Sequence, residues 1–317
     1  MSSPLSSPAS RRGFLLVVLA ALLWGTSGVS GRLVADRAGL GPLDIAWHRL
    51  AIGAVALLAG FLLSRRRGDA TPSLDRGTTI RLVLVGAGLA AYQFAYFAAV
   101  ATAGVSIATL VALGLAPLLI AVGAALLGHG RPDRATLAAL VVALVGLVLL
   151  VGISAGADTG TTVVLGALLA VGSALGYAVV TLAGGGVPAG VPVTLVGFAG
   201  GALLLTPVAL GAGLHTTTDP GALAVLLYLG LIPSALAYGL FFTGLRSVPG
   251  AVAAIVTLLE PLTATALATA FLGERLAPGA LAGGLLVPAA VAGLYLRRMG
   301  DSNSRGVAPN PLSKRAP

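Results

Sequence analysis

The sequence predicts an all-α integral membrane protein with ten transmembrane helices, arranged as two inverted five-helix repeats. Three observations support this fold class. The 317 residues are 57% hydrophobic and only 9% charged, with a mean hydropathy of +1.01. The apolar residues form ten runs, each long enough to cross a bilayer as a helix of about 20 residues. The order of motifs in the first half of the chain also recurs in the second half.

Short turn-forming or charged segments, such as Gly39-Leu40-Gly41-Pro42 and Asp219-Pro220-Gly221, separate the apolar runs. None of the runs alternates between apolar and polar residues as a membrane barrel strand would. Each is therefore expected to be a helix, which satisfies its own backbone hydrogen bonds within lipid. The expected spans cover residues 14–34, 43–63, 80–100, 105–127, 135–153, 162–183, 191–211, 221–243, 249–271 and 279–297.

Basic residues are unevenly distributed between the connecting segments. With the N-terminus placed in the cytoplasm, 15 of the 19 lysines and arginines fall on the cytoplasmic side. Because positive residues are retained on that side, we expect a multi-pass protein of the plasma membrane with both termini cytoplasmic. Residues 1–13 and 298–317 are polar and contain several prolines, and we expect them to be disordered cytoplasmic tails.

The second half of the chain repeats the motifs of the first half in the same order. Ala116-Pro117-Leu118 corresponds to Glu260-Pro261-Leu262, and in each half a Leu-Gly pair follows before the last span. We therefore expect a first repeat over residues 14–153 and a second over residues 162–297. Five spans in each repeat invert the second relative to the first, an arrangement found in many secondary transporters.

Glu260 is one of only two glutamates in the chain and lies near the middle of an apolar run. A carboxylate at that depth costs about 2.5–3.5 kcal/mol on insertion scales, so it normally faces a protein interior or a wet cavity. Pro261 removes a backbone donor directly after it. Charge beside a helix break is typical of a solute or ion site. A purely structural role, in which Glu260 pairs with an arginine or caps free backbone groups, remains open.

Several polar-tipped residues lie at plausible membrane depth and could line a cavity together with Glu260. Tyr92 and Tyr96 are four residues apart and share one helix face. Arg49 could attract an anionic group of a substrate, or it could pair with Glu260 or Asp44. Each of these side chains could instead only bond a neighbouring helix or anchor its own. The candidate cavity residues are Trp24, Arg49, Tyr92, Gln93, Tyr96, Tyr177 and Tyr238.

With these spans and motifs, the chain resembles the drug/metabolite transporter superfamily, in its EamA branch, over residues 14–297. The Leu259-Glu260-Pro261-Leu262 and Leu272-Gly273-Glu274-Arg275-Leu276 motifs carry the resemblance, with support from Trp24-Gly25 and Arg49. It implies ten helices in two inverted EamA repeats around a central cavity that exports amino acids, metabolites or drugs. The first half departs from the motifs, with Ala116 for the glutamate and His129-Gly130 for Glu-Arg. The motif residues are Glu260, Pro261, Gly273, Glu274 and Arg275, and Pro117 is the counterpart of Pro261.

Residues and resemblance together predict a secondary transporter that exports a small metabolite, such as an amino acid, by alternating access, and not an enzyme. The only lysine is Lys314, so no phosphate-binding P-loop exists. Burial favours the neutral form of a carboxyl group, so proton coupling through Glu260 is one alternative and facilitated diffusion is the other. We expect a small-molecule substrate and the lipid bilayer as partners, and no cofactor, metal or nucleic acid.

Two rival functions remain open. Gly25-Thr26-Ser27-Gly28 fits the Gly-x-Ser-Gly of rhomboid-like intramembrane serine proteases, and His48 lies at a similar predicted depth to Ser27. Two five-helix repeats have no place in that architecture. The second rival is a non-transporting membrane scaffold, which needs neither a glutamate within a span nor internal inverted symmetry.

Overall fold

The computed structural model describes residues 8–64, 75–128, 134–155, 160–188, 190–244, 247 and 256–305, which are largely helical and contain no β-strand. Within these residues, six helices are long and apolar enough to cross a membrane. The chain is therefore a multi-pass membrane protein, as the sequence predicts. Part of the predicted span 249–271, and the His129-Gly130 pair, lie outside the described residues.

The first predicted span is interrupted near its middle. Helix α1 covers Pro8–Gly25 and helix α2 covers Ser27–Ala38, with Thr26 between them. The Thr26 hydroxyl donates to the Leu23 carbonyl at 2.7 Å, a local bond typical of hydroxyl residues where helices bend. Helix α2 ends at Gly39, whose φ of 65° is the left-handed conformation that glycine supplies at helix C-termini.

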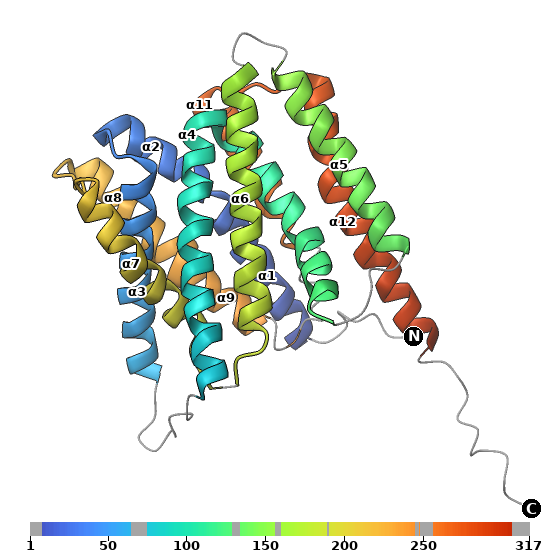
Figure 1. Ribbon diagram of the computed structural model, residues 1–317, viewed down its shortest axis with the longest axis horizontal. Coiled ribbons are helices and arrows are strands. Elements are labelled where there is room, and N and C mark those ends of the chain that lie inside the picture. The colour runs from blue at the N-terminus through green and yellow to red at the C-terminus, as the bar shows by residue number, and fades with distance from the viewer. Residues whose placement is uncertain are drawn as a thin grey trace, which may run out of the picture.

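Helix α3 covers Pro42–Ser64, and α4 covers the 51 residues Arg76–Leu126. A straight helix of that length would extend about 75 Å, more than twice the hydrocarbon core of about 30 Å. The chain instead reverses direction at Gly104, which has φ 84° and ψ 168° (Figure 1). We call residues 76–103 the first arm of α4 and residues 105–126 the second arm. The arms correspond to the predicted spans 80–100 and 105–127.

The remaining described helices follow at positions close to the predicted spans. A π-helix, η1, separates α8 from α9 and contains Pro233, which cannot donate a backbone hydrogen bond. Helix α11 has only 14 residues and begins two positions before Pro261. The bounds are α5 Arg134–Ala155, α6 Gly160–Gly184, α7 Val193–Gly211, α8 Pro220–Gly230, η1 Leu231–Leu236, α9 Ala237–Gly244, α11 Leu259–Leu272 and α12 Pro278–Arg305.

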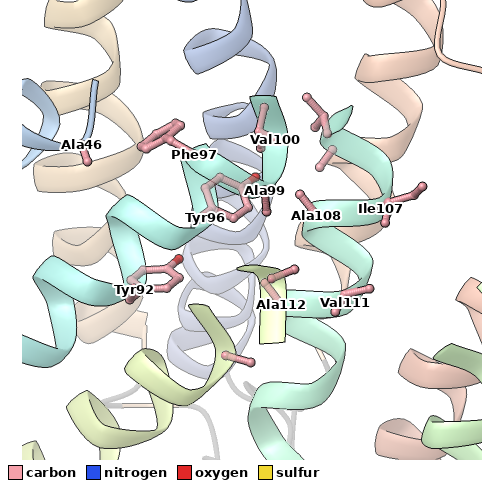
Figure 2. Close-up of a cluster of buried hydrophobic side chains, with 14 of the residues drawn as sticks. Ala46, Tyr92, Tyr96, Phe97, Ala99, Val100, Ile107, Ala108, Val111 and Ala112 are labelled. Carbon is pink, nitrogen blue, oxygen red and sulfur yellow. The ribbon is translucent and has the colours of Figure 1, made fainter. Parts of the chain in front are cut away.

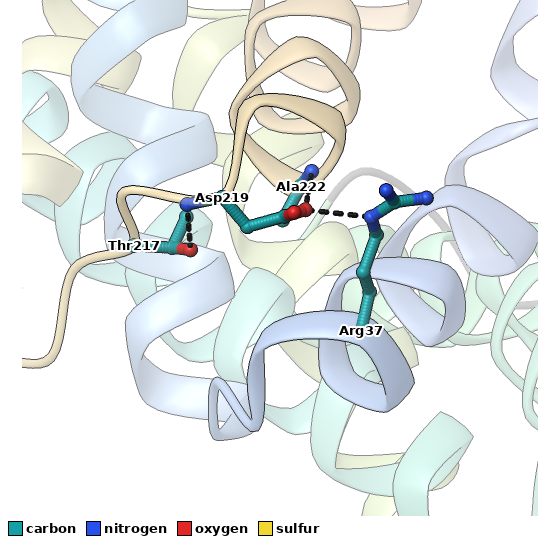
Figure 3. A network of polar contacts seen from close by, with 4 residues as sticks. All are labelled: Arg37, Thr217, Asp219 and Ala222. Carbon is teal, nitrogen blue, oxygen red and sulfur yellow. Dashed lines mark hydrogen bonds and ion pairs between the residues drawn. The ribbon is translucent and has the colours of Figure 1, made fainter.

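The start of α8 is tied to the end of α2 by Asp219 (Figure 3). Its carboxylate caps α8 by accepting from the Ala222 N–H at 2.7 Å, and it also accepts from Arg37 Nε at 2.6 Å. The Asp219 N–H in turn donates to the Thr217 hydroxyl at 3.1 Å. Residues 182 positions apart in the chain are thereby joined at one end of the bundle.

The hydrophobic core is built around the two arms of α4, with side chains from neighbouring helices (Figure 2). Glycines allow α6 to approach the first arm closely. A Cβ on Gly176 would lie 2.8 Å from the Tyr92 nitrogen and 2.9 Å from the Gly88 carbonyl oxygen. Since lipid provides no hydrophobic drive between helices, such close backbone contact is a main source of stability in membrane bundles.

Helix α1 begins and α12 ends at the same end of the molecule, the lower one in Figure 1. We call this the basic end, because the helix ends that face this way carry most arginines. The opposite end holds Arg32, Arg37 and Arg275, near the ends of α2 and the α11–α12 connection. The arginines toward the basic end are Arg11, Arg12, Arg76, Arg81, Arg134, Arg297, Arg298 and Arg305.

Candidate functional site

Arg49 is fully inside the bundle, on α3, with 3% of its surface exposed. Its Nε donates to the Ser234 hydroxyl at 3.1 Å, and one terminal nitrogen donates to the Gln93 Oε1 at 3.1 Å. The guanidinium also lies over the Phe97 ring, 5.8 Å from its centroid. A buried charge is costly unless polar partners fix it, and these partners are neutral. Arg49 is therefore a positive charge held in place with no carboxylate bonded to it among the described residues.

Ser234 reaches Arg49 because η1 distorts the α8–α9 segment. The Ser234 hydroxyl donates to the Leu229 carbonyl at 2.9 Å, five residues back, and accepts from Arg49. Single π-helical turns occur frequently at functional sites, since the extra residue re-aims side chains. Pro233 next to Ser234 is the signal in the sequence that could have identified this residue, just as Pro261 marks Glu260.

Glu260 lies in the first turn of α11 and is half-buried. Its carboxylate forms no hydrogen bond or ion pair with another described residue, although it interacts electrostatically with Arg49. Pro261 occupies the third helical position, where its missing N–H breaks no helical bond. The helix N-terminus provides a positive partial charge that favours a carboxylate nearby. The Glu260 carboxylate is therefore unpaired within the described part of the chain.

The break between α1 and α2 lies directly against the start of α11. A Cβ on Gly25 would be 2.6 Å from the Thr263 Cβ and 2.8 Å from the Glu260 carbonyl oxygen. The Thr26 hydroxyl accepts from the Tyr228 hydroxyl on α8 at 3.0 Å. Two helix interruptions, one in each half of the chain, thus meet beside Glu260, which places irregular backbone next to the candidate carboxylate.

Several aromatic side chains lie around Arg49 and Glu260. Trp24 contacts Tyr238 edge-on at a centroid distance of 5.1 Å, and Tyr92 contacts Tyr177 at 5.5 Å. The Tyr96 hydroxyl shares a hydrogen bond of 2.9 Å with Thr109 on the second arm of α4. Tyr92, Tyr96 and Tyr238 all lie in the neighbourhood of both Arg49 and Glu260. These rings present apolar faces with polar tips.

The structure thus brings the predicted cavity residues into one group, which we call the central cluster. Two of its donors, Trp24 Nε1 and Gln93 Nε2, are buried and have no hydrogen-bond partner in the described part of the chain. Buried polar atoms normally have partners, so these two are suited to a ligand or to water. The central cluster consists of Trp24, Arg49, Tyr92, Gln93, Tyr96, Tyr177, Ser234, Tyr238 and Glu260.

Glu274 occupies a different place and makes different contacts. Its two carboxylate oxygens accept from the backbone N–H groups of Val105 at 2.6 Å and Ser106 at 2.9 Å. These groups begin the second arm of α4, so the carboxylate caps that helix and complements its dipole. Gly104 is required beside it, because a Cβ there would lie 2.8 Å from Glu274 Oε1. Glu274 holds the α4 reversal to the second half of the chain.

The other motif residues lie apart from the central cluster. Gly273 ends α11 with a φ of 68°, the conformation expected of a glycine C-cap. Arg275 is exposed at the end opposite the basic end, and Pro117 lies within the second arm of α4. For the protease alternative, Ser27 and His48 form no hydrogen bond with each other among the described residues. The His48 Nδ1 lies 2.7 Å from the Asp44 carbonyl oxygen instead.

Comparisons with known proteins agree with this architecture. The EamA-like transporter family matches the chain over residues 11–152 and 164–296. "Uncharacterized transporter YwfM" of Bacillus subtilis (strain 168) is 33% identical over 235 residues, covering 74% of this chain and 77% of that protein. "Uncharacterized inner membrane transporter YicL" of Salmonella typhimurium is 26% identical over 253 residues, covering 76% of this chain and 80% of that protein. A solved chain, "Crystal structure of protein", superposes with a TM-score of 0.62 at 25% identity, covering 90% of this chain and 98% of that one.

Proposed function

This chain belongs to the EamA-like transporter family, and we propose that it exports a small zwitterionic metabolite, such as an amino acid, by alternating access. The observation that carries the proposal is the separation of charges in the central cluster. Arg49 is a fixed cation bonded to neutral groups, and Glu260 is a carboxylate with no hydrogen bond or ion pair to another described residue. A molecule that carries a carboxylate and an ammonium group satisfies both.

The aromatic rings of the central cluster suit the apolar part of such a solute. Trp24 and Tyr238 lie against each other, and Tyr92 and Tyr177 form a second pair. Small-molecule sites typically combine an apolar lining with a few polar groups that fix orientation. The unbonded Trp24 Nε1 and Gln93 Nε2 supply further donors for a carboxylate.

We place the basic end in the cytoplasm of a plasma-membrane protein, with both termini on that side, because arginines concentrate there. Export then moves the solute from the basic end toward the end where α2, α8 and the α11–α12 connection lie. The ten-helix arrangement in two inverted repeats belongs to this proposal, since it gives two halves that can rock about the central cluster. Transport measured with and without a pH gradient distinguishes proton coupling through Glu260 from facilitated diffusion.

The test is uptake of a panel of labelled amino acids into liposomes that hold the purified protein, with and without an imposed pH gradient. Uptake of one class that responds to the gradient supports proton-coupled transport. Uptake that does not depend on the gradient supports a transporter that works without proton coupling. If no amino acid moves in protein that remains monodisperse, the proposed substrate class is wrong.

The variant Glu260→Gln then tests the role of the carboxylate, because it removes the charge and keeps the shape. We expect transport to fall at least about tenfold, which corresponds to about 1.4 kcal/mol. Asp75→Asn is the matched control, since Asp75 is an exposed N-cap at the start of α4 and asparagine caps about as well. Equal transport by Glu260→Gln and wild type, with the same response to pH, would exclude Glu260 from coupling and binding.

A further inference from the structure

A pocket lies outside the central cluster, where α2, α3 and the first arm of α4 meet at the end opposite the basic end. Its volume is about 160 Å³. One water molecule occupies about 10–15 Å³ of such a volume, so the pocket has room for a solute of on the order of ten heavy atoms. Residues that line it include Gly31, Arg32, Asp36, Ile45, Phe97 and Ala101.

The Phe97 side chain forms the wall between this outer pocket and Arg49. It lines the pocket, and its ring is also the one over which the Arg49 guanidinium lies, 5.8 Å from the centroid. Figure 2 shows the ring extending toward α3, on the side of Ala46. The ring is only 2% exposed. One aromatic side chain therefore separates the pocket from the cation of the central cluster.

Gly31 on α2 lets the Phe97 ring close this wall. The ring occupies the space that a Gly31 side chain would need, with Phe97 Cδ1 2.7 Å from an ideal Cβ. Tyr96 contacts the same ring edge-on at a centroid distance of 5.4 Å. Phe97 and Tyr96 both belong to α4, so the contact that is lost when α2 moves away from α4 is the one between the Phe97 ring and Gly31. Loss of that contact would free the ring to move out of the wall.

The pocket carries one charge of each sign. Arg32 and Asp36 are one helical turn apart on α2 and pair at 2.9 Å, with 41% and 53% of their side chains exposed. An exposed ion pair of this kind contributes little to stability. Replacing it by ion pairs with a ligand therefore costs little free energy. The ammonium group of a zwitterion could pair with Asp36 and its carboxylate with Arg32. In the central cluster the same two groups would pair with Glu260 and Arg49.

We propose that the pocket between α2, α3 and α4 is a second, exit-side subsite for the transported zwitterion, and that Phe97 is the gate between it and Arg49. This inference rests on the proposed export function. In the structure the gate is closed, so a solute on Arg49 cannot reach the pocket. When the α2–α3 end moves away from α4, the solute passes the ring and meets Arg32 and Asp36 before release.

The chain contains no cysteine, so single-cysteine variants test the proposal directly. Ala35→Cys places a thiol in the pocket lining, and Ser234→Cys places one behind Phe97, next to Arg49. Both are treated in intact cells with a membrane-impermeant thiol reagent. We expect Ala35→Cys to react from outside and the transported solute to protect it. Labelling only in inside-out vesicles, or no protection by a solute that is transported, would overturn the assignment.

The gate is tested by combining Ser234→Cys with Phe97→Ala. We expect the labelling rate from outside to rise about tenfold or more, because accessibility follows the open population. Leu118→Ala is the control, since Leu118 is a fully buried side chain in the second arm of α4 and does not line the pocket. An equal rise with Leu118→Ala, or no rise with Phe97→Ala, would refute the gate.

The failure of this inference is distinguishable from failure of the proposed function. Transport of the amino-acid panel is measured on wild type in liposomes and does not depend on the cysteine variants. If wild type transports a solute and the pocket thiol is neither accessible nor protected, only the exit subsite is wrong. If no solute is transported, the proposed function itself is wrong, and with it the subsite that depends on it.

Discussion

Glu274→Ala removes the carboxylate that caps the second arm of α4 and leaves the backbone N–H groups of Val105 and Ser106 without partners. Both residues are completely buried, and the bonds lost measure 2.6 and 2.9 Å. An unsatisfied buried donor costs about 1–3 kcal/mol, so two cost about 2–6 kcal/mol in the free energy of unfolding. Glu274→Gln keeps one acceptor oxygen and should cost about half as much.

In the assay, purified variants are heated in the same detergent, and unfolding is measured as the loss of the monodisperse fraction with temperature. With about 2–4 °C lost per kcal/mol in proteins of 150–250 residues, we expect Glu274→Ala to lower the midpoint by at least about 4 °C and Glu274→Gln by less. Arg275→Gln is the control, because Arg275 is the neighbouring residue and is exposed. Surface substitutions of this kind usually change stability by less than about 0.5 kcal/mol.

The ordering of these variants tests the reasoning more sharply than any single value. Wild type should be most stable, then Glu274→Gln, then Glu274→Ala, with Arg275→Gln close to wild type. If Glu274→Ala unfolds at the same temperature as Arg275→Gln, the carboxylate does not hold the second arm. Because that arm carries Thr109, which bonds Tyr96 at 2.9 Å, Glu274→Ala should also weaken solute binding in the central cluster.

Three further predictions follow from the same structure. Arg49→Lys keeps the charge but cannot bond both Ser234 and Gln93 as the guanidinium group does. We therefore expect the affinity for the solute to fall about tenfold or more in a binding assay. Unchanged affinity would show that Arg49 does not bind the solute. Gly25→Ala forces a Cβ against α11 and should destabilise the protein by about 1–3 kcal/mol, whereas Gly172→Ala, which points into open space, should not. The Ala222 N–H and the Arg37 guanidinium hold the pKa of Asp219 below its ordinary value of 3.8. This contribution to stability is therefore complete above about pH 4 and is lost as the pH falls through the lower native pKa, so Asp219→Asn should flatten that acid dependence in thermal melts.

The identity of the central cluster could be predicted largely from residue type and depth. Glu260, Arg49 and the tyrosines are polar groups in apolar runs, and lipid makes such residues costly unless they meet inside the protein. Ser234 was missed because serine is common in membrane helices and is tolerated there. Its position in a π-helix next to Pro233 is what brings it to Arg49.

The two glutamates show where prediction from sequence ends. Both stand in motifs, and the sequence proposes Glu260 for the site because it lies within an apolar run, but it does not indicate what either carboxylate contacts. Only the contacts distinguish them. Both Glu274 carboxylate oxygens accept from the backbone of Val105 and Ser106, whereas the Glu260 carboxylate forms no hydrogen bond or ion pair with another described residue. Phe97 was not predicted at all, since a phenylalanine in an apolar span carries no signal of a gate.

The sequence by itself determined that the chain is helical, crosses the membrane several times and belongs among transporters of this kind. The helical, multi-pass character follows from local composition, because apolar runs without charges must be helices in lipid. The likeness to transporters rests instead on the motifs around Glu260 and Glu274. The tertiary structure decided which polar groups satisfy one another and which remain free. That depends on contacts between residues far apart in the chain, such as the bond between Glu274 and Val105, 169 positions apart, that holds the α4 reversal, and no local pattern encodes them.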